Sequence, residues 1–166
     1  MDLALEQDAA QNSALGAFLI THFCVEYFNT SNQTRGPTLP QTLLVLPLIY
    51  HRQTVSSLKR MQRQSGLLKA LADNPSIQVG LNRRTHSLTK RTFKSILISC
   101  NTKLLRLNQE DDWPTLTPLP NATKALKSLS PAGMELRDMQ KATTRLGWWL
   151  PGIDHVNLYA LLRLSP

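Results

Sequence analysis

Two stretches in the first third of the chain show the clearest pattern of apolar and polar positions. Between residues 14 and 28, apolar side chains recur at i, i+3, i+4 and i+7, which is the spacing of one helical face. Further apolar residues fill much of the remaining surface, so we expect a helix that is buried on most sides. Asn12 or Ser13 is placed to cap its first turn. Residues 29–40 are polar and contain Gly36 and two prolines, which predicts a loop.

The densest apolar run of the chain follows, from Leu43 to Tyr50, and it contains no charge. It predicts a segment buried on all sides, because each large aliphatic side chain is stabilised by about 1.5–3 kcal/mol when it leaves water. The run is far shorter than the roughly 20 residues of a membrane-spanning helix. Pro47 interrupts it, so we expect either two short helices or an extended segment.

Residues 51–101 show a series of short amphipathic patterns. We expect one helix to start near Thr54 or Ser56, and a second to run from Ser65 to about Asn74. A further helix follows, and Thr89 is expected to cap the last helix of the group. The residues expected to face inward in that last helix are Phe93, Ile96, Leu97 and Cys100.

The period of the pattern changes after residue 102. Residues 103–107 and 113–117 predict two short strands around an acidic turn, and Pro114 confines the second strand to a sheet edge. Gly152 breaks the pattern near the end of the chain, and Asp154 is placed to cap a closing helix. The helices expected after the hairpin are 122–129, 135–149 and 155–164.

These elements predict a mainly α chain with a small β-hairpin, an α+β fold with a winged-helix-like helical domain. A chain of 166 residues is most simply one domain, 1–166. Its parts would be a helical core at about 12–101, a hairpin wing at about 103–117 and C-terminal helices at about 122–164. In a winged-helix domain the helix before the wing commonly reads nucleic acid.

The net charge of +8 is concentrated in the middle of the chain. Residues 51–106 contain twelve Lys and Arg but one acid, whereas residues 1–50 carry a net charge of −3 and residues 107–166 are neutral. A localised basic face is typical of proteins that bind nucleic acid or an acidic protein surface. The plainer interpretation is a solvated face whose acids come from an adjoining subunit. The residues expected to make contacts are Arg83, Arg84, Lys90, Arg91 and Lys94.

The sequence contains no motif that indicates catalysis. The seven glycines form neither a P-loop nor a dinucleotide-binding fingerprint, and the four histidines show no metal-ligand spacing. Glu110, Asp111 and Asp112 cluster in a turn, which is more typical of a solvated loop than of a metal site. Cys24 and Cys100 are expected to be free thiols. We therefore expect no enzymatic activity and no cofactor.

No segment indicates export or a membrane. The first eleven residues are acidic and lack the basic region and apolar stretch of a secretion signal. We expect a cytoplasmic protein that does not contact a membrane. Phe93 is the one aromatic residue within the basic region, so a stacking platform for single-stranded nucleic acid is not expected.

Trp148 and Trp149 are adjacent on a predicted helix, where their side chains point about 100 degrees apart. One can enter the core while the other faces outward, and tryptophan is enriched at interface hot spots. The pair therefore predicts a partner anchor, or equally a helix that is buried on two sides.

Several short motifs, taken in order, resemble one protein family. They are Asn12-Ser13-Ala14-Leu15-Gly16-Ala17, the run Leu44 to Arg52 with its L-P-L-x-x-H-R pattern, Leu67 to Pro75, Lys103 to Leu107, and Leu146-Gly147-Trp148-Trp149. Their order resembles the middle components of bacterial three-component ABC systems, over nearly the whole chain. Ser13 stands where that family usually has proline.

The resemblance implies an accessory subunit without an active site. In such systems a coiled-coil ABC ATPase, similar to SMC and Rad50 proteins, senses DNA, and another subunit carries the effector, often a nuclease. The chain is similar to the small middle subunit of Lamassu anti-phage systems. The partners so implied are the ATPase and the effector, with double-stranded DNA as a further contact. The alternative is a free-standing winged-helix DNA-binding regulator.

Overall fold

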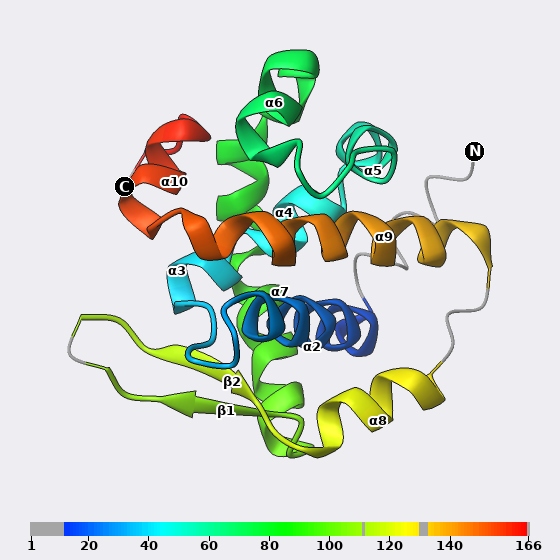
Figure 1. Ribbon diagram of the computed structural model, residues 1–166, viewed down its shortest axis with the longest axis vertical. Coiled ribbons are helices and arrows are strands. Elements are labelled where there is room, and N and C mark those ends of the chain that lie inside the picture. Colours follow the sequence, from blue (N-terminus) through cyan, green and yellow to red (C-terminus); the bar gives the residue numbers. More distant parts are fainter. Residues whose placement is uncertain (1–11, 111, 130–132, 166) are drawn as a thin grey trace.

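The computed structural model describes residues 12–110, 112–129 and 133–165 of the chain. Most of these residues are helical, and two strands form a small antiparallel sheet, which confirms the predicted α+β class. In Figure 1, helices α2 and α9 lie across the molecule and α7 runs behind them along its long axis. The three helices enclose much of the core.

The first described helix is α2, Ser13–Thr30, and it begins where the sequence predicts. The Asn12 side chain caps it by accepting hydrogen bonds from the backbone N–H groups of Ala14 and Leu15. As expected, α2 is buried on most sides, because α9 and α7 both pack against it. Its completely buried residues include Leu19, Ile20, Phe23 and Cys24.

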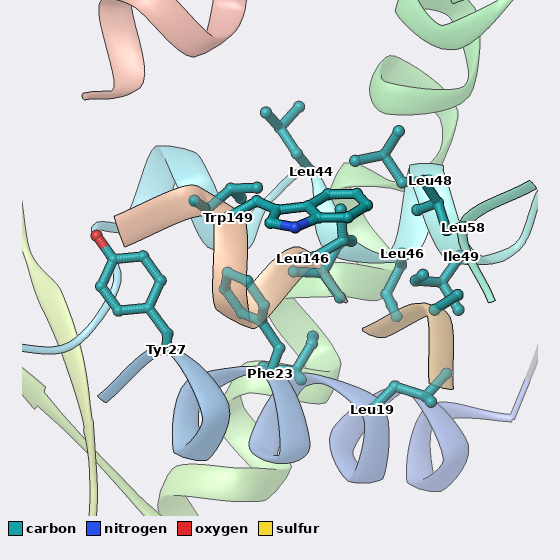
Figure 2. Packing of buried hydrophobic residues seen from close by; sticks show 14 of the residues in the cluster. Leu19, Phe23, Tyr27, Leu44, Leu46, Leu48, Ile49, Leu58, Leu146 and Trp149 are labelled. Carbon is teal, nitrogen blue, oxygen red and sulfur yellow. The ribbon is translucent and has the colours of Figure 1, made fainter. Parts of the chain in front are cut away.

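The apolar run from Leu43 to Tyr50 contains one short helix, α4 (Val45–Ile49), and another short helix, α3 (Leu39–Thr42), lies just before it. The expectation that Pro47 divides the run into two helices or leaves it extended is therefore wrong. Pro47 fits inside the first turn of α4, where its missing N–H group would have no partner within the helix. Every residue of α4 is buried, as the absence of charge predicts. Figure 2 shows Leu44, Leu46 and Trp149 as members of one buried cluster.

Gln41 of α3 is a buried polar residue that the sequence analysis did not single out. Its side-chain oxygen accepts a hydrogen bond from the Tyr27 hydroxyl at 3.0 Å. Its side-chain nitrogen donates to the backbone oxygens of Leu150 and Ile153. One amide therefore joins the end of α2 to the turn that follows α9.

Three short elements lead to the longest helix. They are α5 (Arg52–Leu58), α6 (Gly66–Asp73) and the 3-10 helix η1 (Pro75–Ile77). The α5 helix begins at Arg52, before the start expected near Thr54 or Ser56, and no side chain caps its first turn. Lys59, just after α5, forms an ion pair with Asp138 of α9 at 2.7 Å.

A single helix, α7 (Leu81–Asn101), replaces the two helices expected in this region. The prediction that Thr89 caps a helix is wrong, because its hydroxyl donates to the backbone oxygen of Thr85 inside α7. The helix instead begins after Gly80, whose positive φ of 69° suits glycine. The chain between η1 and α7 is therefore a tight turn.

The predicted hairpin is present, with strands β1 (Leu105–Asn108) and β2 (Thr115–Pro118). The strands are antiparallel, with Leu105 opposite Pro118. The segment before α3 binds the other edge of β2, away from β1. The Leu39 N–H donates to the Pro114 oxygen and the Leu116 N–H donates to the Pro37 oxygen. A helix followed by a hairpin is thus observed, while the winged-helix likeness itself stays a prediction.

The chain ends with α8 (Asn121–Ser128), α9 (Met134–Trp149), the 3-10 helix η2 (Leu150–Gly152) and α10 (His155–Leu161). Asp154 caps α10 as expected, since its carboxylate accepts from the Asn157 N–H at 3.0 Å. The buried cluster takes side chains from α2, α4–α7, both strands, α9 and α10. The division into core, wing and C-terminal helices remains a prediction.

Candidate interaction surface

The outer face of α7 carries most of the residues that the sequence marks as contacts. Arg83, Lys90, Lys94 and Leu97 are all exposed. At about 100° per residue they fall within an arc of about 60° on the helix surface. Phe93 lies at one edge of this arc with 40% of its surface exposed. We call these five residues the α7 face.

The opposite side of α7 is buried, but its side chains are mostly small and polar. Ser95 donates a hydrogen bond to the Ser13 oxygen, and Ser99 donates to the Ala17 oxygen, so both bind α2 directly. The Ser99 and Thr21 hydroxyls also lie 3.0 Å apart. Serine and threonine side chains therefore make part of the contact for which only apolar residues were expected.

This packing corrects the predicted orientation of the helix. Of the residues expected to face inward, Ile96 is buried and Cys100 is partly buried. Phe93 and Leu97 are exposed instead, Leu97 by 60%. The apolar positions of α7 thus extend beyond the surface that the described part of the chain covers.

Arg84 does not belong to the α7 face. Its guanidinium is half-buried and donates three hydrogen bonds to backbone oxygens, those of Pro47, Val79 and Ile77. These oxygens lie at the end of α4 and around η1, where helices leave carbonyl groups without partners. Burial lowers the pKa of Arg84. Its role in this structure is to join three elements.

Arg91 lies on the same flank of α7 as Arg84, toward α4. Burial raises the pKa of Tyr50 to about 12, and the nearby positive charge of Arg91 opposes that rise. Arg91 is partly buried, whereas Lys90 and Lys94 beside it are exposed. The five predicted basic contacts therefore divide into three on the exposed face and two on the flank.

Trp149 belongs to the core, with 6% of its surface exposed. Its indole N–H donates to the Arg63 backbone oxygen at 2.9 Å, which satisfies the one polar atom of the ring. Trp149 therefore anchors the loop after α5 to α9 within this chain.

Trp148 is partly buried, and two cations lie close to its ring. The guanidinium carbons of Arg63 and Arg145 lie 5.4 and 5.1 Å from the centroid of its ring, which are cation–π distances. Burial raises the pKa of Glu26, and a hydrogen bond from Trp148 opposes the rise. A role for Trp148 or Trp149 as a partner anchor stays a prediction.

A second group of exposed apolar side chains lies near the start of α7. Leu68 of α6 is 65% exposed and Val79, just after η1, is 70% exposed. The two elements pack against each other. Phe93 is twelve residues along α7 from Leu81, which corresponds to about 18 Å at 1.5 Å per residue. Leu68 and Val79 are therefore separate from Phe93 and Leu97. Further exposed apolar residues lie elsewhere, at Leu107, Trp113, Leu129, Met134 and Val156.

The buried titratable groups are held in their neutral forms. Burial lowers the pKa of His22 to about 4, and its Nε2 atom lies 2.7 Å from the Thr144 hydroxyl. Burial also raises the pKa of the Cys24 thiol, and the nearby Cys100 adds to the rise. Both cysteines are free thiols, as expected. A thiol held protonated in this way is a poor nucleophile.

Within residues 12–110, 112–129 and 133–165, no three His, Cys, Asp or Glu side chains are placed to hold a metal ion. Asp111 of the predicted acidic turn lies outside these ranges. None of the helices in the same ranges combines the length and the apolar character needed to cross a membrane.

Comparison with known proteins gives one match. The model of the family described as ABC-three component (ABC-3C) system Middle Component 3 matches residues 2–166. No curated protein and no solved structure matches the chain.

Proposed function

Since this chain belongs to the family of middle components of ABC-three component systems, we propose that it is a non-catalytic subunit that links the ABC ATPase of such a system to its effector. The observation that carries the proposal is the family match, which spans residues 2–166. A middle component acts together with the other components of its system.

The finer parts of the proposal are supported by the family resemblance of the ordered sequence motifs. The ATPase would be a coiled-coil protein of the SMC and Rad50 type, and the effector would be a nuclease or another toxic enzyme. The complex would act in the bacterial cytoplasm against phage, in the manner of Lamassu systems. Double-stranded DNA would be a further contact of the assembled complex.

The arrangement of exposed side chains supports a linking role. A linking subunit needs two contact regions on a stable body. The α7 face supplies one, and the exposed Leu68 and Val79 supply a candidate for the other. The body between them is fixed by buried polar contacts such as those of Gln41 and Arg84.

Co-purification tests the proposal. The tagged chain is co-expressed with the ABC ATPase and the effector of the same system, and both are expected to co-purify in a ternary complex. When the chain is omitted, association of ATPase with effector should fall by at least tenfold. If ATPase and effector associate equally well without it, the linking role is wrong.

One observation favours the alternative of a DNA-binding regulator. The helix with three exposed cations leads directly into a hairpin, as in a winged helix. If Arg83, Lys90 and Lys94 contact three phosphates, the logarithm of the DNA affinity should fall with the logarithm of salt concentration with a slope of about −2.7. A chain that binds no ATPase but binds an operator duplex with that slope would favour the regulator.

A further inference from the structure

The α7 face combines exposed apolar side chains with positive charges that form no ion pair within the described part of the chain. Phe93 and Leu97 are one helical turn apart, so their side chains are neighbours on the surface. They are 40% and 60% exposed although the helix pattern predicts their burial. The side of α7 that is buried carries Thr92, Ser95 and Ser99 beside the apolar Leu81 and Ile96. Phe93 and Leu97 are therefore available to be buried by another molecule, since the described part of the chain does not bury them.

The charged residues of α7 all have the same sign. Arg83, Lys90 and Lys94 are exposed, and they form no ion pair with any described residue. The sequence contains no Asp or Glu from residue 74 to residue 109, so α7 has no acid of its own. Lys90 and Lys94 are one turn apart, where like charges repel. A partner that brings acidic groups would relieve this repulsion.

The shape of the surface favours a helical partner. The α7 face runs from Arg83 to Leu97, which is about 21 Å along a straight helix. A second helix packed along it would place apolar residues against Phe93 and Leu97 and its flanking residues against the cations. Coiled-coil interfaces use the same combination of an apolar seam and flanking charge pairs.

We propose that the α7 face binds an amphipathic helix of the ABC ATPase, whose apolar stripe is flanked by Asp and Glu residues. This inference depends on the proposed linking function and names the surface and the chemistry of one partner. Phe93 and Leu97 fix the contact by burial, and Arg83, Lys90 and Lys94 select an acidic partner and speed its association.

DNA is the competing occupant of a basic helix. Phosphate contacts require only the cations, and they give Phe93 and Leu97 no role. An acidic helix requires both kinds of residue. The two occupants are therefore separated by changing the apolar and the charged residues independently.

The test uses the full chain with two pairs of substitutions. One pair is Phe93→Ser with Leu97→Ser, and the other is Lys90→Glu with Lys94→Glu. Matched controls are available on α8, where Lys124 and Lys127 are exposed, and just after it, where Leu129 is 57% exposed. The controls are Lys124→Glu with Lys127→Glu, and Leu129→Ser. Circular dichroism and denaturant midpoints establish that each variant is folded.

Affinity is measured for the purified ABC ATPase and, separately, for a 30-base-pair duplex (about three helical turns). Both α7 pairs should weaken ATPase binding by at least tenfold, while the α8 controls change it by less than twofold. Binding to the effector should not change. The inference is overturned, and the face is assigned to DNA, by two results together. The Lys90→Glu and Lys94→Glu pair weakens only DNA binding, and the Phe93→Ser and Leu97→Ser pair changes neither affinity.

The two failures are distinguishable. If the wild-type chain binds the ATPase and both α7 pairs bind equally well, the linking function stands and the α7 inference is wrong. If the wild-type chain binds neither ATPase nor effector, the proposed function itself fails. A charge swap would identify the partner helix. The Lys90→Glu and Lys94→Glu variant should bind again to an ATPase in which acidic residues of that helix are replaced by Lys or Arg.

Discussion

Gly16 of α2 lies directly against Ser95 of α7, so close that a Cβ atom added to Gly16 would overlap the Ser95 hydroxyl. Ser95 in turn donates a hydrogen bond to the Ser13 oxygen at the start of α2. The two helices can cross this closely only because one side has no side chain and the other has a small one. This crossing fixes which side of α7 is buried, and so it leaves Phe93 and Leu97 outside.

The first prediction concerns this crossing. Gly16→Ala should reduce the free energy of unfolding by about 1–3 kcal/mol, because an added methyl group forces the close-packed helices apart. The matched control is Gly152→Ala, where an added Cβ meets no atom within 4 Å. Its effect should stay below about 0.5 kcal/mol, as for ordinary surface changes. Urea unfolding followed by circular dichroism measures both, and equal effects would contradict the account of the crossing.

Much of the fold was predictable because local signals agreed with the tertiary structure. Asn12 and Asp154 cap the helices that the sequence assigns to them, and the uncharged run forms the predicted buried segment. Thr89 was misassigned because a threonine can either cap a helix or donate to a carbonyl one turn back within it. The local sequence is the same in both cases, and only the course of α7 distinguishes them.

The candidate site was less predictable for a related reason. A hydrophobic pattern assumes that apolar residues mark the buried side, whereas α7 buries Ser95 and Ser99 against the small residues of α2. Arg84 looked like a surface cation, and only the positions of three backbone oxygens distant in sequence show its structural role. Such contacts depend on chain segments that sequence spacing does not bring together.

The second prediction separates Arg84 from its neighbour. Arg84→Met should cost about 2 kcal/mol or more, because hydrogen bonds from a charged donor contribute about 1.5–3 kcal/mol and the carbonyl partners lose them together. Arg83→Met, at an exposed position, should cost less than about 0.5 kcal/mol. Thermal and urea unfolding of both variants test this. A stable Arg84→Met variant would return Arg84 to the list of surface contacts.

The third prediction concerns pH. In the folded chain the pKa of His22 is lowered from 6.5 to about 4 by burial, so the folded state takes up its proton later than the unfolded state as pH falls. The contribution of neutral His22 to the free energy of unfolding is fully present above pH 6.5 and is lost between about pH 6.5 and pH 4. Its full size is about 3 kcal/mol.

Substitution isolates this contribution. The unfolding free energy of His22→Gln should fall less steeply than that of the wild type across this pH window, with the two curves converging by about 3 kcal/mol. Thr144→Val removes the hydrogen-bond partner of His22 and should keep the wild-type pH dependence, because burial is the cause of the lowered pKa. Parallel curves for His22→Gln and the wild type would show that His22 is not held neutral in the folded chain.

The fourth prediction distinguishes the two adjacent tryptophans. Trp149→Phe should cost about 1–3 kcal/mol, because it leaves the Arg63 oxygen without its donor and opens space in the core. Trp148→Phe keeps an aromatic ring near Arg63 and Arg145 and should cost less than about 1 kcal/mol, which is the range of an exposed cation–π contact. The denaturant midpoints of the two variants decide the matter. The reverse order of stability would mean that Trp148, and not Trp149, holds α9 to the loop after α5, and it would leave Trp149 as the candidate anchor for a partner.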